Sequence, residues 1–150
     1  MNRPKREGGF LLSKIHQMSK RIFSKKLKKA GLGEINSAQG RILFVLWRKD
    51  GIPITELANK TALEKSTLTA MLDRLERKGL LKRVRPPEDR RKILIVLVPA
   101  HIGLEKKFEK VSAEMGTLFY DGFSENDKDR FEGYLRRVFS NLDKNGGGRR

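Results

Sequence analysis

ITELANKTALEKSTLTAMLDRLERKGLLKRV, residues 54–84, contains two helical patterns separated by a short turn. In the first pattern, from Thr55 to about Lys60, Leu57 and Ala58 face inward. The second pattern, residues 64–78, has apolar residues at i, i+3, i+4 and i+7: Leu68, Met71, Leu72 and Leu75. Gly79 follows at the point where a left-handed C-terminal residue is favoured. We therefore expect two helices in close succession.

A basic hairpin is expected directly after these helices. Residues 81–85 are typical of a strand, PPED at residues 86–89 is typical of a turn, and residues 92–98 form a β-branched run that returns antiparallel. The order helix, turn, helix and hairpin matches a winged helix-turn-helix. The expected fold class is therefore mainly α with a small β-hairpin.

Longer amphipathic helices are predicted on both sides of this lobe. Apolar spacing predicts them over residues 11–29, about 102–120 and from Ser124 onward, where Asp127 is a weak capping-box partner. A further helix, with Ser37 as its N-cap, is expected to be buried because residues 42–47 are densely apolar. The outer helices carry three stripes: Leu11, Ile15, Met18 and Ile22; Leu104, Phe108, Val111, Met115 and Leu118; Phe131, Leu135, Val138 and Leu142.

Each of these stripes must be buried against another surface. Because the central lobe has its own core, we expect the terminal helices to pack against the same helices of a second chain. The sequence therefore predicts a homodimer with a helical interface. The alternative is a monomer in which the three helices cap the lobe.

The composition excludes several classes of protein. The chain has 150 residues, no cysteine and two histidines, so disulfides, zinc fingers and thiol nucleophiles are excluded, and neither a metal site nor a cofactor is expected. No apolar run approaches the roughly 18 residues of a membrane span, and no signal peptide is recognisable. No paired histidine, phosphate loop or convergent carboxylate motif supports an enzyme. We expect a cytoplasmic binding protein.

The net charge of +16 indicates a polyanionic partner. Residues 1–30 carry +9 and residues 61–100 carry +5, whereas the two remaining segments carry +1 each. The second cluster coincides with the predicted DNA-binding lobe, which favours duplex DNA as the partner. The first cluster exceeds what operator binding needs, so an architectural, weakly sequence-specific DNA-binding protein is the alternative function. A membrane surface is not favoured, because a dimer would bury the apolar stripe of the first helix.

The second helix of the lobe supplies the candidate base-reading residues. A recognition helix buries one side and presents short polar or cationic side chains to the major groove. Here the outer face is Lys65, Ser66, Thr67, Thr69, Ala70, Asp73, Arg74 and Arg77. Arg74 is the first candidate for direct contact with bases.

The hairpin tip supplies candidates for the minor groove, which attracts arginine through its narrow width and negative potential. The arginines there are Arg85, Arg90 and Arg91. Asp89 would be repelled by phosphate, so we expect it to orient Arg91. A plain surface ion pair is the alternative interpretation.

The stretch from Ile54 to Gly103 resembles the multiple antibiotic resistance regulator (MarR) family of winged helix-turn-helix transcriptional regulators. LDRLERKGL at residues 72–80 and the D-x-R wing at Asp89 and Arg91 are the most specific parts. The resemblance implies a ligand-responsive repressor that binds a pseudo-palindromic operator as a homodimer. It places these residues at DNA: Ser66, Thr67, Thr69 and Arg74 in the major groove, Arg91 in the minor groove with Asp89 orienting it, and Ser37 at a phosphate.

The same resemblance divides the chain into parts. It implies one domain over residues 1–150, with the winged helix-turn-helix lobe at 37–99 and a helical dimerisation region at 10–30 and 100–143. The glycine-rich residues 144–150 are expected to form a disordered tail. Family members often bind a small phenolic or anionic effector between the dimer helices and the lobe. The candidate lining residues, each also suited to an ordinary core, are His16, Phe23, Phe44 and Trp47.

Overall fold

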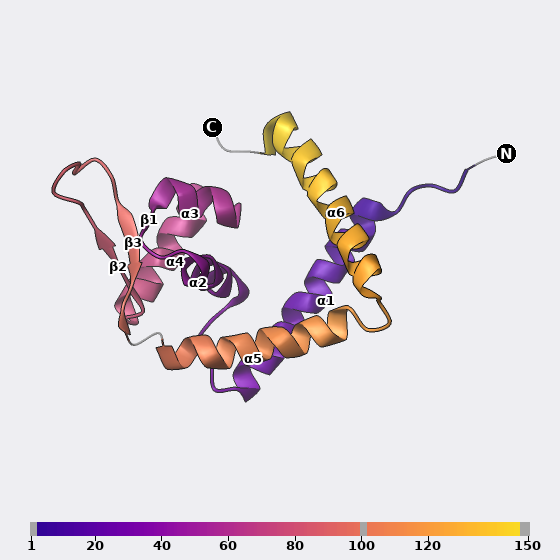
Figure 1. Cartoon of the computed structure of the whole chain (residues 1–150), viewed down its shortest axis with the longest axis horizontal. Helices are drawn as coiled ribbons and strands as arrows, with labels where there is room; N and C mark the ends of the chain where they lie inside the picture. The colour runs from indigo at the N-terminus through magenta and orange to yellow at the C-terminus, as the bar shows by residue number, and fades with distance from the viewer. Residues whose placement is uncertain (1–2, 100–101, 148–150) are drawn as a thin grey trace.

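A computed structural model describes residues 3–99 and 102–147 of the chain. Its elements in chain order are α1 (Gly8–Lys29), α2 (Ser37–Arg48), β1 (Ile52–Pro53), α3 (Ile54–Thr61), α4 (Lys65–Arg77), β2 (Leu81–Val84), β3 (Leu94–Leu97), α5 (Ile102–Phe119) and α6 (Glu125–Leu142). Figure 1 shows two parts: a lobe made of α2, α3, α4 and the strands, and an arm made of α1, α5 and α6. The predicted fold class, a winged helix-turn-helix lobe joined to terminal helices, is confirmed.

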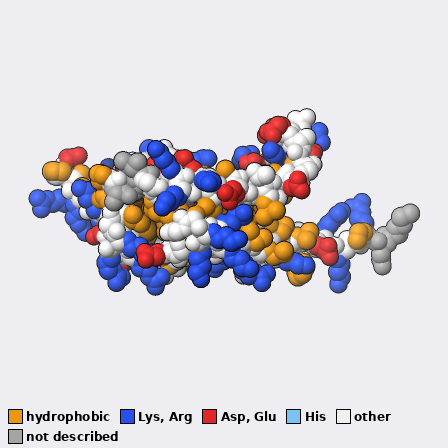
Figure 2. Space-filling model, turned by 90° about the horizontal axis from the view of Figure 1, so that it is seen from below, with side chains coloured by type: hydrophobic (Ala, Val, Ile, Leu, Met, Phe, Trp, Pro, Cys, Tyr) orange, Lys and Arg blue, Asp and Glu red, His pale blue; other side chains and the backbone are white. Residues whose placement is uncertain are grey.

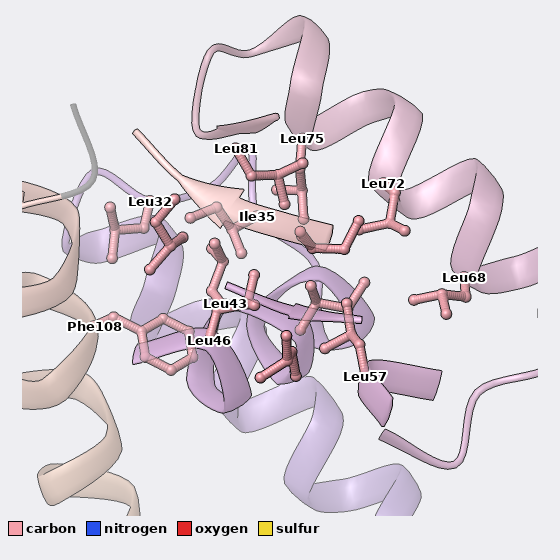
Figure 3. Close-up of a cluster of buried hydrophobic side chains, with 14 of the residues drawn as sticks. Leu32, Ile35, Leu43, Leu46, Leu57, Leu68, Leu72, Leu75, Leu81 and Phe108 are labelled. Carbon is pink, nitrogen blue, oxygen red and sulfur yellow. The ribbon is translucent and has the colours of Figure 1, made fainter. Parts of the chain in front are cut away.

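The core of the lobe lies where α2, α3, α4 and the sheet meet (Figure 3). Its apolar side chains come from all four elements and are almost wholly buried: Ile42, Leu43, Leu46, Ile52, Leu57, Leu68, Leu72, Leu75, Leu81 and Ile95. Three of these leucines, on α4, follow the spacing of 4 and 3 noted in the sequence. One face of α4 is thereby fixed against the lobe, and the opposite face is left to solvent.

The hairpin belongs to a three-stranded sheet in the order β1-β3-β2. β2 and β3 pair antiparallel as predicted, with Leu81 opposite Leu97. β1, whose Ile52 pairs with Ile95, was not predicted, because two residues are too few for a periodic signal. Asp50 Oδ1 accepts hydrogen bonds from the N–H of Gly51 at 2.8 Å and of Leu97 at 2.9 Å, which attaches this short strand to the hairpin.

The predicted N-cap of α2 was wrong by one residue. Asn36, with extended backbone, is the N-cap, and its Oδ1 accepts a hydrogen bond from the Gln39 N–H at 2.8 Å. Gln39 Oε1 in turn accepts from the Asn36 N–H at 3.1 Å. The amide side chains of Asn36 and Gln39 thus form a complete capping box, which leaves Ser37 as the first helical residue.

α5 joins the arm to the lobe through one aromatic side chain, Phe108. Its ring lies 5.6 Å from the ring of Phe23 on α1 and 5.1 Å from that of Trp47 on α2. Gly40 of α2 lets the helices approach so closely that a Cβ there would lie 2.9 Å from the Phe108 ring. The apolar stripe of α5 therefore does not lie wholly outward as expected, because Phe108 and Val111 are buried within the chain.

The corner between α5 and α6 is held by an aromatic cluster with ring centroids 5.0 to 6.2 Å apart: Phe119, Tyr120, Phe123 and Phe131. Burial within this cluster raises the pKa of Tyr120, and the nearby Glu132 carboxylate raises it further. The predicted capping box at the start of α6 is confirmed, with the Asp127 N–H donating to Ser124 Oγ at 3.1 Å.

The structure describes the first residues of the tail that was expected to be disordered, 144–147, directly after α6. A short irregular turn, Asp143–Gly147, continues the helix, and Asn145 Nδ2 donates to the Asn141 carbonyl at 2.8 Å. The last residues of the predicted tail, 148–150, lie outside the described residues.

Candidate nucleic-acid interface

α4 presents a face of short side chains next to its buried leucines. Ser66, Thr69 and Ala70 are exposed and border a shallow depression that also includes Lys65 and Asp73. Such a face permits close approach to base edges in the major groove. Thr67, which was predicted to share this face, is instead half-buried.

The cations of α4 extend this face toward both ends of the helix. Lys65 lies in its first turn, whereas Arg74 and Arg77 lie in its last turn, and all three are exposed. Arg77 Nε donates to the Asp73 carbonyl at 3.4 Å, while Arg74 projects without a side-chain partner among the described residues. Arg74 is therefore free to extend toward a ligand.

Arg83 of β2, which was not among the predicted site residues, neutralises the acids of α4. Its guanidinium Nη2 lies 2.7 Å from Asp73 Oδ1, and its Nη1 lies 3.2 Å from Glu76 Oε2. Nη2 also donates to the Thr69 carbonyl at 3.4 Å. The side chain of Arg83 is only 26% exposed. One strand residue thus ties the wing to the recognition helix and compensates the two carboxylates within α4.

A signal for this contact exists in the sequence but needs the fold to be interpreted. Asp73 and Glu76 are three residues apart and therefore lie on neighbouring positions of one helix surface. Lys82 and Arg83 lie on the next strand and Arg85 directly follows it, and only the packing of β2 against α4 selects Arg83 among them.

The wing tip is built from two consecutive turns. The Asp89 N–H donates to the Pro86 carbonyl and the Lys92 N–H donates to the Asp89 carbonyl, each at 3.2 Å. Asp89 Oδ1 accepts hydrogen bonds from the backbone N–H of Arg91 at 3.1 Å and from its Nε at 3.2 Å. The predicted contact is therefore present, and Arg91 remains 92% exposed. Arg90 is exposed nearby.

Arg85 stabilises the wing from inside. Its Nη1 donates to the Arg90 carbonyl at 2.9 Å across the tip. The side chain of Arg85 thus bridges the two arms of the loop while remaining exposed to solvent. Ser37, the expected phosphate contact at the start of α2, is half-buried.

α3 supports the recognition helix from its far side. Ala62, at φ 54°, makes the sharp turn between α3 and α4. The Thr61 hydroxyl is buried and donates to the Leu57 carbonyl at 2.8 Å. Hydrogen bonding from Lys60, helped by Lys49, lowers the pKa of Glu56 at the start of α3. These contacts stabilise α3, and the left-handed backbone of Ala62 forms the turn that leads into α4.

The four predicted effector residues are not gathered into one site. Phe23 and Trp47 converge on Phe108, which was missed as a contact residue because it is separated from them by more than 60 positions in the chain. His16 is exposed on α1, and Phe44 lies under the guanidinium of Arg48, 4.6 Å from its ring centroid.

A cavity of about 640 Å³ lies elsewhere, between the start of the recognition helix and the end of α6. Its apolar lining includes Ala58, Leu63, Leu68, Phe139 and Leu142. His16, Phe23, Phe44 and Trp47 do not line it. Within residues 3–99 and 102–147 there is no group of three side chains able to hold a metal ion, and no helix there is long and apolar enough to cross a bilayer.

Comparison with known proteins agrees with this architecture. A family model described as "MarR family" matches residues 35–93. The transcriptional repressor YetL of Bacillus subtilis is 32% identical over 126 residues, which cover 75% of this chain and 68% of YetL. The crystal structure of a MarR transcriptional regulator from Methanosarcina mazei superposes with a TM-score of 0.78 at 26% identity, covering 93% of this chain and 99% of that one.

A further structure has the same fold at lower identity. BpsR of Bordetella bronchiseptica superposes with a TM-score of 0.78 at 22% identity. The DNA binding of BpsR is described as regulated by 6-hydroxynicotinic acid. The superposition covers 89% of this chain and 98% of BpsR.

Proposed function

Because the chain belongs to the MarR family, whose members are helix-turn-helix transcriptional regulators, we propose that it is a sequence-specific repressor that binds a pseudo-palindromic operator as a homodimer. The observation that carries the proposal is the pairing of an exposed, short-side-chain recognition face on α4 with an arginine-bearing wing, both on one rigid lobe. The related proteins compared above are regulators and not enzymes.

In this proposal α4 enters the major groove. Arg74 contacts base edges, because it is exposed and uncommitted, and a guanidinium can bind guanine through two hydrogen bonds. The rest of the helix supplies the remaining contacts: Lys65, Ser66, Thr67, Thr69 and Arg77. Ser37, at the start of α2, binds a phosphate.

The wing binds the adjacent minor groove. Arg91 inserts there, since its side chain is almost fully exposed while Asp89 holds its Nε on the wing side. Arg85 and Arg90 contact the flanking phosphates. The carboxylate of Asp89 is only 29% exposed and is occupied by Arg91, so it adds little repulsion toward DNA.

A second copy of the chain covers the apolar side of the arm. Large apolar side chains are 40% or more exposed along α1 and α6: Phe10, Leu11, Leu12, Ile15, Met18, Tyr134, Val138, Phe139 and Leu142. An exposed set of this size is unusual for a monomer. Burial against the same helices of a partner would place two recognition helices on one operator. A protein that binds chromosomal DNA in this way would act in the cytoplasm.

Release from DNA by an aromatic, anionic effector is part of the proposal. It is supported by the similarity to BpsR, whose DNA binding is described as regulated by 6-hydroxynicotinic acid. The cavity beside α4 has a volume typical of small-molecule sites. Occupation of that cavity would bear directly on the turn that sets the angle of the recognition helix.

Selection of bound duplexes from a random pool tests the proposal. A repressor of this kind enriches one pseudo-palindrome whose half-sites are about one helical turn apart. Arg74→Ala is expected to cost about 1–3 kcal/mol in operator binding and to relax the sequence preference. Arg137→Ala, on α6, is the matched control and should leave the preference unchanged.

Equal affinity for the selected and random duplexes would overturn the proposal. It would favour the architectural alternative, which predicts binding set by charge and salt alone. A measured slope of log affinity against log salt that is equal for both duplexes would also favour that alternative.

A further inference from the structure

The proposed operator and dimer contacts leave the cations of α1, the most cationic helix among the described residues, without a role. α1 contains seven Lys and Arg side chains and no Asp or Glu over its 22 residues. Its C-terminal half alone carries Lys20, Arg21, Lys25, Lys26, Lys28 and Lys29. Favourable interaction with the helix dipole accounts for cations in the last turn only.

Five of these six cations, all except Lys26, are exposed. Three of the five lie together in the last turns of α1: Lys25, Lys28 and Lys29. Within the described residues none of the three forms an ion pair, whereas their neighbour Lys26 lies 3.6 Å from Glu114 of α5. The positive charge at this end of α1 is therefore mostly unpaired within the described residues. We call Lys25, Lys28 and Lys29 the lysine face.

The lysine face stands on a rigid support. Leu27, in the same turn, is fully buried, and Phe23 packs against Phe108 of α5. A flexible tail could follow any anion in its neighbourhood. On a packed helix the positions of the cations are fixed instead. A partner of the lysine face must therefore lie on that side of the molecule.

The C-terminal end of α1 lies far from the first turn of α4. Lys78, just after α4, donates from its Nζ to the Glu34 carbonyl in the loop that follows α1, and Gly33 of this loop lies against Lys28. α1 therefore ends near the C-terminal end of α4. Because α4 has 13 residues, its first turn, which carries Lys65 and Ser66, lies about 20 Å further along its axis.

Figure 1 shows where the end of α1 lies, and Figure 2 shows the charge of the surface seen from that side. In Figure 1 the C-terminal end of α1 is at the bottom, whereas the wing tip is at the top left. Figure 2 views the molecule from below, and blue Lys and Arg side chains dominate its charged surface. The C-terminal end of α1 and the wing tip therefore lie on different sides of the lobe.

We propose that the lysine face binds the phosphate backbone of a second duplex segment, outside the operator, while α4 and the wing hold the first. The inference rests on the proposed function in so far as the lobe binds DNA. The charge is complementary, and exposed lysines bind phosphates without reading sequence. In a homodimer two such faces would join distant segments or fold the flanking DNA back on the protein.

The number of contacts predicts a weak site. Three phosphate contacts contribute about 2.7 to the slope of log affinity against log salt, since each contributes about 0.9. Such a site alone binds only at low salt. Once the protein is held on a first duplex, two faces acting together raise the effective affinity for the second.

A two-duplex capture assay tests the proposal. Protein is loaded on beads that carry a 30-base-pair duplex of mixed sequence, and retention of a second, fluorescent duplex is measured at low salt. The test variant is the triple substitution Lys25→Gln, Lys28→Gln, Lys29→Gln. The matched control is Arg130→Gln, Arg136→Gln, Arg137→Gln, which removes the same charge from α6, where cations and acids are equal in number.

We expect the lysine variant to retain at least fivefold less second duplex, with protein retention on the first duplex changed less than twofold. The control should match wild type in both readouts. Circular dichroism verifies that both variants are folded, as expected for substitutions at exposed positions.

Two results would overturn the proposal. If the lysine variant captures as much as wild type, or wild type captures nothing, the face binds no second duplex. If the control loses capture equally, net charge is responsible. Operator preference is measured separately on the same proteins. If the chain shows no operator preference but still captures the second duplex through its lysines, the repressor proposal is refuted and the proposal of a second DNA site stands.

Discussion

Replacing Arg83 by Met is expected to lower the free energy of unfolding by about 1–2 kcal/mol. Arg83 forms two ion pairs, at 2.7 Å with Asp73 and at 3.2 Å with Glu76. Both carboxylates are more than 40% exposed, so solvent screens them, and each such pair contributes about 0.2–1 kcal/mol. The upper part of that range applies, because Arg83 itself is mostly covered and its geometry is good. Methionine keeps the apolar stem and removes only the charge.

Urea unfolding followed by circular dichroism measures this effect, with all proteins at one concentration because a dimer is more stable when concentrated. A slope of about 2 kcal/mol per molar urea converts the loss to a midpoint shift of about 0.5–1 M. Lys82→Met, on the same strand, is the control, because Lys82 is exposed and forms no ion pair within the described residues. Its effect should stay within about 0.5 kcal/mol.

A double-mutant cycle with Asp73→Asn isolates the pair itself. The two substitutions together should cost less than the sum of the single ones, by about 0.5–1 kcal/mol, because each removes the same interaction. Additive effects, or an Arg83→Met protein as stable as the Lys82→Met control, would refute the claim that Arg83 ties the wing to the recognition helix.

Three further substitutions test other contacts. Asn36→Ala should cost about 1 kcal/mol of stability by removing the cap of α2, whereas Ser37→Ala should cost little; the reverse order in thermal melts would restore the N-cap expected from the sequence. Gly40→Ala should destabilise by about 1 kcal/mol net, since crowding of the Phe108 ring costs about 1–3 kcal/mol and helix propensity returns about 1; a stabilised protein in urea titrations would contradict that close approach. Asp89→Ala should weaken operator binding about 5–10-fold, roughly 1 kcal/mol by fluorescence anisotropy, although it removes a negative charge; tighter binding would show that Asp89 orients nothing.

The elements with a periodic apolar pattern were predictable from the sequence. On α4 the leucines at spacings of 4 and 3 are almost wholly buried, and the Ser124–Asp127 capping box is present as expected. Such signals are local, because a helix brings residues three and four positions apart onto one face. The Asp89–Arg91 contact was accessible for the same reason, since it spans two residues in a tight turn.

The contacts that join distant segments were not predictable. β1 was missed because a two-residue strand gains its hydrogen bonds from a partner more than 40 positions away. Phe108 was assigned to an outward stripe, yet Gly40 admits its ring into the junction of α1, α2 and α5. The effector candidates were dispersed because similar aromatic residues serve unrelated packing roles in different elements.

The sequence by itself thus determined the order of elements, the recognition helix, the basic wing and the excess charge, because each depends on residues a few positions apart. Only the tertiary structure decided that Arg83 neutralises the acids of α4 and that the end of α1 carrying the lysine face lies far from the first turn of that helix. Both results depend on how α1, α4 and β2 are oriented against one core. Local sequence patterns specify which face of an element is apolar, whereas the packing of those faces specifies where its charges lie.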